Sequence, residues 1–218
     1  MRPCWRWSWV GLLLIGGPSA AVDGPRLEVD TETSRAYAKV MSSTRLGHDH
    51  AVVGRLSSGS LTLGGPCDLV FDMRTFVSDR PEARDYVGLT KAISASDADK
   101  VTATMLGKDV LDVAQFPTAR YACRSMSMLD DQAAGAPGRY RLEGEFTLHG
   151  MVRTMPLTAT LEKTDKPGVL RMKCTFPVLQ SAHGIKPYKA VGGLVGANDT
   201  LEIWGDLVLR VATAKGTR

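Results

Sequence analysis

Alternating residues between positions 138 and 163 limit the possible folds of this chain more than any other feature. Over residues 140–148 every second residue is apolar or glycine, and the residues between them are mostly charged. The alternation resumes over residues 154–161, after a break at His149 and Gly150. Such alternation is typical of a strand with one buried and one wet face, and a glycine-containing break between two such runs predicts a hairpin.

Six further segments are predicted as strands. They span residues 33–43, 51–63, 67–77, 119–128, 169–180 and 201–211. Gly54 and Gly59 mark expected bulges or bends, and Pro177 marks a point where a ladder should end or bulge. About eight antiparallel strands with short connections predict an all-β, closed up-and-down barrel, because closure removes the aggregation-prone edges of an open sheet. Such a barrel has room for its own side chains or for one slim ligand.

Residues 78–108 differ from the rest because they are charged and lack a period of two. The segment 81–86 suits a helical turn that begins at a capping Asp79. Residues 96–99 suit a capping box before a second helix, and Gly107 stands where a C-terminal glycine belongs. We therefore expect one or two short helices, inserted between the third and fourth strands, that cover one edge or end of the barrel.

The first 21 residues have the features of a signal peptide. Arg2 and Arg6 precede a short apolar run at 10–15, and residues 19–21 fit the small-residue cleavage rule. The run is far shorter than the roughly 20 residues of a membrane span, although an uncleaved amphipathic anchor is the alternative. Cleavage would leave residues 22–218 as a single domain that begins with a polar lead-in over 22–32, and we expect it in the periplasm or secreted.

Charge and cysteine content exclude several classes of protein. The chain has 27 basic and 23 acidic residues and no basic run, which argues against a nucleic-acid partner. After signal removal Cys67, Cys123 and Cys174 remain, an odd number that does not suit a disulfide scaffold. Cys123 and Cys174 share parity with apolar neighbours and are interpreted as small buried hydrophobes.

Four histidines are the candidate metal ligands: His48, His50, His149 and His183. In a strand the first two would point the same way, which suits one zinc ion. The simpler interpretation is that this H-x-H spacing is accidental, and we expect no metal and no cofactor. A G-x-S-x-G elbow is absent from the sequence, and paired acidic residues occur in loop or capping positions, so we expect a protein that is not an enzyme.

Two motifs resemble the YceI-like family. Gly144, the run Phe-Thr-Leu-His-Gly at 146–150, and the pairs at 152–153 and 156–157 resemble its G-x-LTLHGVTRPV-x-L signature. Residues 109–114 with 116–119 resemble its F-D-V-x-x-Y-P motif. The resemblance extends from about residue 27 to 211 and implies a secreted bacterial protein with a lipocalin-like antiparallel barrel, some members of which bind polyisoprenoid lipids. The chain departs from the family pattern at 46–54 and at 181–198, where three of the histidines lie.

An apolar stripe on the inward faces of the strands is the candidate ligand site. It has two interpretations, a packed core or a tunnel for an isoprenoid or acyl tail, and the resemblance favours the tunnel. The residues predicted to contact the ligand are Phe71, Tyr121, Gly144, Phe146, Leu148, Leu157, Met172 and Phe176.

The glycine-rich segment 181–198 is predicted to be an irregular loop over the barrel mouth. Lys186 and Lys189 could meet a phosphate or lipid head group there, with ordinary solvated lysines as the alternative. Contact with a membrane would be transient. The predicted function is non-catalytic binding of a polyisoprenoid or other lipid; the alternatives are a metal-binding exported protein and a ligand-free envelope protein with a stress or structural role.

Overall fold

The computed structural model describes residues 24–129 and 138–212. Its strands are β1 (Arg26–Val29), β2 (Arg35–Ser42), β3 (His50–Thr62), β4 (Cys67–Ser78), β5 (Thr118–Met128), β6 (Gly138–Leu148), β7 (Met151–Thr154), β8 (Leu157–Lys163), β9 (Val169–Leu179), β10 (Lys189–Ala190) and β11 (Val195–Val211). Within these residues two α-helices, α1 (Pro81–Tyr86) and α2 (Ala95–Leu106), lie between β4 and β5. Single 3-10 turns cover Ser181–His183 and Val191–Gly193.

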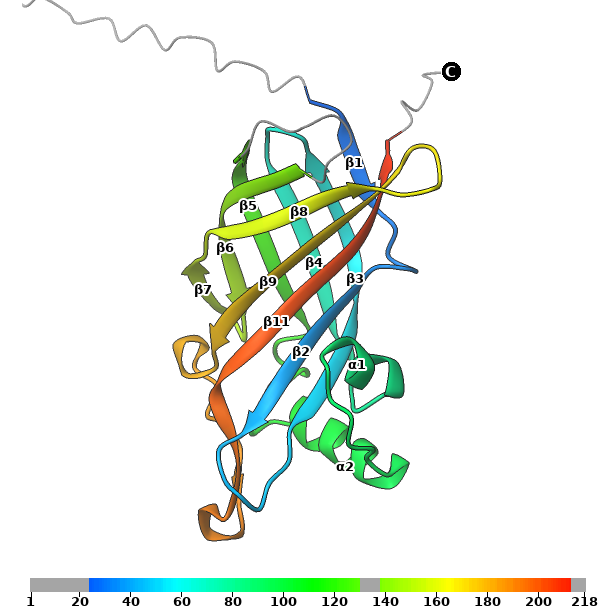
Figure 1. Cartoon of the computed structure of the whole chain (residues 1–218). Helices are drawn as coiled ribbons and strands as arrows, with labels where there is room; N and C mark the ends of the chain where they lie inside the picture. Colours follow the sequence, from blue (N-terminus) through cyan, green and yellow to red (C-terminus); the bar gives the residue numbers. More distant parts are fainter. Residues whose placement is uncertain (1–23, 130–137, 213–218) are drawn as a thin grey trace, which may run out of the picture.

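Eight of the strands form a closed antiparallel barrel (Figure 1). Their order is β11-β2-β3-β4-β5-β6-β8-β9, and β9 pairs back with β11 over residues 169–179. α1 and α2 follow β4 and precede β5, which in chain order are the third and fourth of these eight strands. The prediction of an all-β antiparallel barrel with short helices at that position is therefore confirmed.

The predicted hairpin at residues 138–163 is present. In β6 buried residues alternate with outward-facing ones along the whole strand. His149 and Gly150 have φ angles of 51° and 72°, as the two central residues of a type I′ hairpin turn do. The return arm is divided into β7 and β8 at residues 155–156, but its register against β6 is the same on both sides of the break, and the Met155 N–H still donates to the carbonyl oxygen of Gly144 at 2.8 Å.

The expectation that residues 22–32 form only a polar lead-in is wrong. Leu27 and Val29 of β1 are buried while Arg26 and Glu28 are exposed. β1 pairs with β11 and also with β3, so it joins these two strands at the end of the barrel beyond the start of β2. A strand of four residues shows too little alternation to stand out from a loop in the sequence.

The segment 181–198 is more regular than the predicted loop. It contains the two 3-10 turns and β10, which pairs with β11. β11 begins at Val195 rather than near residue 201, and its pairing with β2 is interrupted by an irregularity between Ala197 and Leu201. The strand therefore extends to the lower tip of the molecule in Figure 1, instead of stopping at the barrel wall.

The predicted strand irregularities are only partly present. The register of β3 against β4 shifts at Gly54, as expected for a bulge, and again between Leu56 and Ser58 rather than at Gly59. A Cβ on Gly59 would come within 2.6 Å of Val29 of β1, so this glycine serves the close approach of β1. Pro177 does not end β9, since the strand continues to Leu179 in regular register with β11. On its other side β9 pairs with β8 only as far as Cys174, so Pro177 interrupts no pairing there.

The two helices are capped differently from the prediction. α1 has Arg80 as its N-cap, without a side-chain hydrogen bond, and Asp79 is used elsewhere. α2 begins after Ser94, whose Oγ accepts the Asp97 N–H at 3.1 Å, so the cap lies two residues before the predicted position 96. Gly107 is the C-cap, as predicted. α1 packs on the outer face of β3, and α2 lies at the lower end of the barrel (Figure 1).

Some predictions lie outside the described residues. They concern the signal peptide at 1–21 and its cleavage site at residues 19–21. Within residues 24–129 and 138–212, no helix combines the length and hydrophobicity needed to span a bilayer.

Candidate functional site

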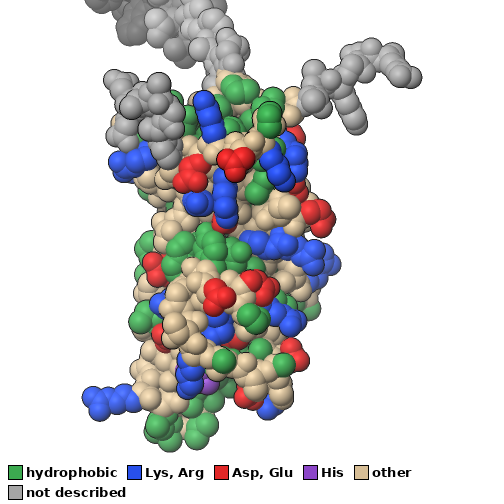
Figure 2. Space-filling model, turned by 45° about the vertical axis from the view of Figure 1, so that its right-hand side comes forward, with side chains coloured by type: hydrophobic (Ala, Val, Ile, Leu, Met, Phe, Trp, Pro, Cys, Tyr) green, Lys and Arg blue, Asp and Glu red, His purple; other side chains and the backbone are tan. Residues whose placement is uncertain are grey.

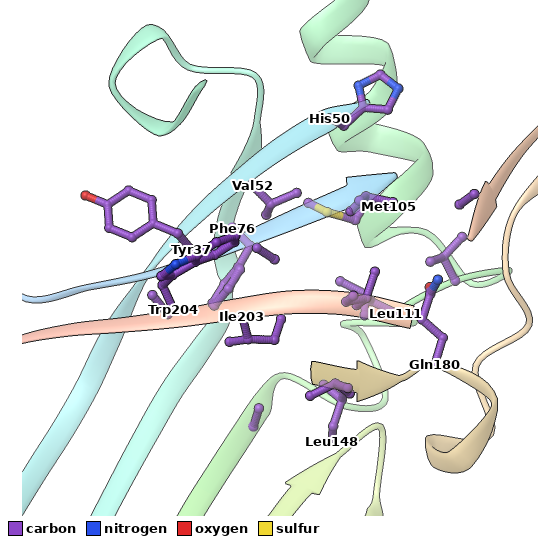
Figure 3. A pocket seen from close by; sticks show the side chains of 18 of the residues that line it. Tyr37, His50, Val52, Phe76, Met105, Leu111, Leu148, Gln180, Ile203 and Trp204 are labelled. Atoms are coloured by element: carbon purple, nitrogen blue, oxygen red, sulfur yellow. The ribbon is translucent and has the colours of Figure 1, made fainter. Parts of the chain in front are cut away.

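The lower half of the barrel encloses a cavity of about 520 Å³ with a largely apolar wall. Figure 3 shows Val52 of β3, Met105 of α2 and Leu148 of β6 around this space. The lining also includes exposed residues of the β2–β3 loop and of the segment 188–197, among them Leu46 and Tyr188. The cavity therefore opens at the lower end of the barrel.

The upper half of the barrel is a packed core. Leu27, Leu61, Met126 and Leu209 are all at most 2% exposed and are not among the residues that line the cavity. They come from β1 and from the upper ends of β3, β5 and β11. The cavity is thus blind: its mouth is at the lower end of the barrel, and these packed side chains, which we call the floor, close its upper end.

Seven of the eight residues predicted to contact a ligand line the cavity. They come from five strands of the ring, β4, β5, β6, β8 and β9, and all face inward: Phe71, Tyr121, Phe146, Leu148, Leu157, Met172 and Phe176. The sequence thus located a large part of the wall, and contact with a ligand stays a prediction for each of them.

Gly144 has a different environment from the other predicted residues and is not among those that line the cavity. A Cβ at this position would lie 2.8 Å from the ring of Tyr121 and 2.7 Å from the carbonyl oxygen of Ala122. The Tyr121 hydroxyl donates to the carbonyl oxygens of Met155, at 3.1 Å, and Leu142, at 3.3 Å. Gly144 therefore makes room for this tyrosine, whose ring covers it.

The opposite wall of the cavity consists of residues that were not predicted from the sequence. β2 and β11 contribute Ala36, Ala38 and Gly205, and α2 contributes Val101 and Met105. The three small residues leave the space that larger side chains would fill. Their inward parity in β2 and β11 is readable from the sequence, and small residues on an inward face are the signal that could have indicated a hollow barrel.

A cluster of aromatic rings stands on the β6–β9 side of the barrel. Phe146 meets Phe176 edge-on, with ring centroids 6.1 Å apart, and meets His183 in the same way at 5.6 Å. His183 is buried, its Nδ1 lies 3.1 Å from the Met151 carbonyl oxygen, and burial lowers its pKa. This histidine lies in the 3-10 turn Ser181–His183, packed behind Phe146, and is not among the residues that line the cavity.

A buried ionic network holds His50 at the mouth. Its Nδ1 lies 2.6 Å from the Asp79 carboxylate, which also receives hydrogen bonds from Arg84 Nη1 at 2.5 Å, the Ala51 N–H at 3.1 Å and the Ser78 hydroxyl at 2.8 Å. Burial would raise the pKa of Asp79, but the hydrogen bonds from His50, Ala51 and Ser78 outweigh it and hold this pKa below its usual value. An ionised carboxylate only accepts, so Nδ1 of His50 carries a proton and the ring orientation is fixed.

The four histidines do not gather at one point. His48 and His50 are neighbours at the mouth, with ring centroids 4.7 Å apart, and burial followed by repulsion from His50 lowers the pKa of His48. His149 packs against Phe116, with ring centroids at 4.2 Å. Among the residues that the structure describes, no group of three or more His, Cys, Asp or Glu side chains could hold a metal ion.

Polar groups are concentrated near the mouth, and apolar side chains line the depth of the cavity. His48, His50, Lys100 and Gln180 line the lower part, whereas Phe71, Leu142, Leu157 and Met172 line the upper part. This arrangement is suited to a molecule with a long apolar tail and a small polar end, because the tail is buried in the barrel and the polar end remains near water.

Comparisons with known proteins agree with this geometry at the level of the fold. The family model described as "YceI-like domain" matches residues 27–208. A solved polyisoprenoid-binding domain from Saccharophagus degradans, implicated in plant cell wall breakdown, aligns with a TM-score of 0.60 at 12% identity, covering 85% of this chain and 98% of that one. BcnA from Burkholderia cenocepacia aligns with a TM-score of 0.49 at 16% identity, covering 85% and 99%. No curated protein matches the sequence.

Proposed function

The chain belongs to the YceI-like family, and from this premise we propose that it binds or carries an apolar chain, a polyisoprenoid or another lipid, without catalysing a reaction. The single observation that carries the proposal is the blind apolar cavity of about 520 Å³. A volume of this order lies in the usual range of roughly 300–1,000 Å³ for small-molecule sites. The solved domain from Saccharophagus degradans is a polyisoprenoid-binding domain with the same fold, which supports this class of ligand.

The energetics of burial are sufficient for useful affinity. Each CH₂ group of a tail gains about 0.8 kcal/mol when it leaves water. A stretch of about ten carbons would then supply about 8 kcal/mol, from which the ordering of the tail and the loss of overall motion are subtracted. The Asp79 carboxylate, itself held by Arg84, fixes the orientation of His50 at the mouth, so the polar end of a ligand would meet a positioned imidazole.

We place this activity in the bacterial periplasm or outside the cell. The support is the signal-like segment at 1–21, whose cleavage would give a mature protein that begins at Val22 or within a few residues of it. N-terminal sequencing of the protein from a cell envelope fraction tests this. Recovery of an intact chain that begins at Met1 and is held in the membrane would contradict it.

Organic extraction of the purified protein tests the proposed binding most directly. We expect mass spectrometry of the extract to find a long-chain lipid close to one molecule per barrel. We also expect the delipidated protein to bind cis-parinaric acid, a fluorescent fatty acid, and the extracted lipid to displace it. If no lipid is extracted and the delipidated protein does not bind the probe, the ligand-free alternative replaces the proposal.

A further inference from the structure

The mouth of the cavity is surrounded by apolar side chains that face solvent. We call Met41, Leu46, Tyr188, Val191 and Leu194 the apolar rim; all five are exposed. Leu46 is 72% and Val191 is 70% exposed, which is unusual for aliphatic side chains. Met41, Leu46 and Tyr188 also line the cavity, so the rim is continuous with the inner wall.

Two segments that are distant in the sequence form this rim side by side. The β2–β3 loop supplies Leu46, and the β10–β11 connection supplies Val191 and Leu194. The Ser43 N–H donates to the Gly196 carbonyl oxygen at 2.9 Å, which joins the segments. Figure 2 shows hydrophobic side chains gathered at the lower end of the molecule, where Figure 1 places the turn before β11.

The backbone holds Val191 in a conformation that this residue rarely adopts. Its φ angle is 50°, in the left-handed region, where a β-branched residue is an outlier. Such strain persists only where the surrounding structure maintains it, and it is concentrated at functional sites. Here it accompanies the projection of an apolar side chain into solvent at the tip of a turn.

The two segments that form the rim carry basic and no acidic residues. Arg45, Lys186 and Lys189 are exposed on the two rim segments, and neither 43–48 nor 184–197 contains an acidic residue. The acidic residues that flank these segments are engaged: Asp49 accepts the Ser42 N–H at 2.8 Å, and Asp199 accepts both the N–H and the hydroxyl of Ser181. Apolar side chains among basic residues suit the surface of a bilayer that contains anionic lipids, into which the apolar groups insert.

From this arrangement we propose that the apolar rim docks the protein onto the surface of an anionic lipid bilayer, with the cavity mouth facing the membrane. Docking itself does not require a loaded cavity. Its purpose rests on the proposed function, because a lipid tail would then pass between membrane and barrel without crossing water.

Co-sedimentation with vesicles tests the proposal. The probe is a set of vesicles of phosphatidylethanolamine with one quarter phosphatidylglycerol, compared with vesicles of phosphatidylcholine alone. We expect the wild-type chain to bind the anionic vesicles and to lose that binding as salt rises. The variant with Leu46→Ser, Val191→Ser and Leu194→Ser should bind at least tenfold more weakly. The variant with Arg45→Gln, Lys186→Gln and Lys189→Gln should lose the preference for anionic vesicles.

A matched control removes exposed apolar side chains from the other end of the barrel. Met128→Ser, Leu129→Ser and Val211→Ser change three exposed residues at or next to the last residues of β5 and β11. These strands end at the upper end of the barrel (Figure 1), so vesicle binding should be unchanged. Binding of cis-parinaric acid in solution is measured on every variant, so a loss of docking is distinguished from a failure of the cavity to bind a chain.

Three results would overturn docking. The first is a wild type that stays in the supernatant with both kinds of vesicle, and the second is equal sedimentation of the rim and control variants. Alternatively, light scattering could show that the rim joins two copies of the chain and that the serine variant is a monomer without any change in vesicle binding. Retained probe binding in any of these cases would leave the proposed function standing.

Discussion

Replacement of Ala38 with phenylalanine tests whether the barrel is hollow. Ala38 lies in the middle of β2, opposite Val52 of β3 and Ile203 of β11, and all three line the cavity. A phenyl ring at this position extends into the cavity from a wall that is made of small side chains. The same ring at Lys39, one residue along and on the outer face, is the matched control.

The expected loss of affinity follows from the volume that the ring takes from the ligand. If it displaces about four methylene groups of the bound tail, the loss is about 3 kcal/mol at about 0.8 kcal/mol per CH₂. This corresponds to an affinity on the order of a hundredfold weaker. Titration of the delipidated variants with cis-parinaric acid measures the change, and Lys39→Phe should bind as the wild type does.

Stability gives an independent second measurement. In a filled barrel an added ring forces its neighbours apart and costs about 1–3 kcal/mol. In a hollow barrel the ring covers apolar wall that is otherwise unfilled, so the free energy of unfolding of Ala38→Phe should be equal to or higher than that of the wild type. Urea denaturation of both proteins decides between them. A destabilised variant that still binds the probe normally would refute the assignment of the cavity as the binding site.

Three further predictions concern other parts of the molecule. Asp79→Asn should lower the free energy of unfolding by about 3–5 kcal/mol at pH 7, because it leaves the Arg84 guanidinium buried without its counter-charge, and the double variant with Arg84→Met should recover part of this loss in urea denaturation. The folded-state pKa of Asp79 lies below its unfolded value of about 3.9, so the stabilisation that ionised Asp79 provides is complete above that value and is lost as pH falls through the folded pKa. The wild type and Asp79→Asn should therefore converge in stability in strong acid. A difference that stays constant down to pH 2 would contradict this. Gly144→Ala should destabilise the fold by about 1–3 kcal/mol, because the added Cβ overlaps neighbours 2.7–2.8 Å away, and it should not weaken probe binding. Weaker probe binding by a folded variant would support the original prediction that this glycine contacts the ligand. Chelator should leave the melting temperature unchanged both in the wild type and in His48→Ala with His50→Ala; a bound metal at a hundredfold excess over Kd would contribute about 2.7 kcal/mol, so a chelator-sensitive wild type would support the metal alternative.

Features that depend on local alternation were predictable from the sequence. The hairpin at 138–163 has a period of two and a His-Gly turn, and both the strand faces and the turn position follow directly from it. The inward positions of Phe71, Phe146 and Met172 follow for the same reason, because the parity of a strand residue decides which face it occupies. β1 escaped prediction because its four residues gain their stability from pairing with β3 and β11, which no local pattern records.

Features that depend on residues distant in the sequence could not be predicted. The His50–Asp79 pair joins positions 29 residues apart and requires a positive φ angle of 57° at Asp79. The local sequence around Asp79 therefore indicates a helix cap and not a partner for His50. The cavity also depends on small side chains: Ala36 of β2 pairs directly with Gly205 of the adjacent strand β11, and only the register of this pairing brings the small residues together.

The packed floor made by Leu27, Leu61, Met126 and Leu209 turns the cavity into a molecular ruler. In an open-ended channel every added carbon would find wall to contact, and affinity would keep rising with tail length. In a blind cavity affinity rises by about 0.8 kcal/mol per methylene only until the tail reaches the floor. Additional carbons then remain at the mouth, in water or in the membrane. In a homologous series of ligands, the length at which affinity stops increasing therefore measures the depth of the barrel.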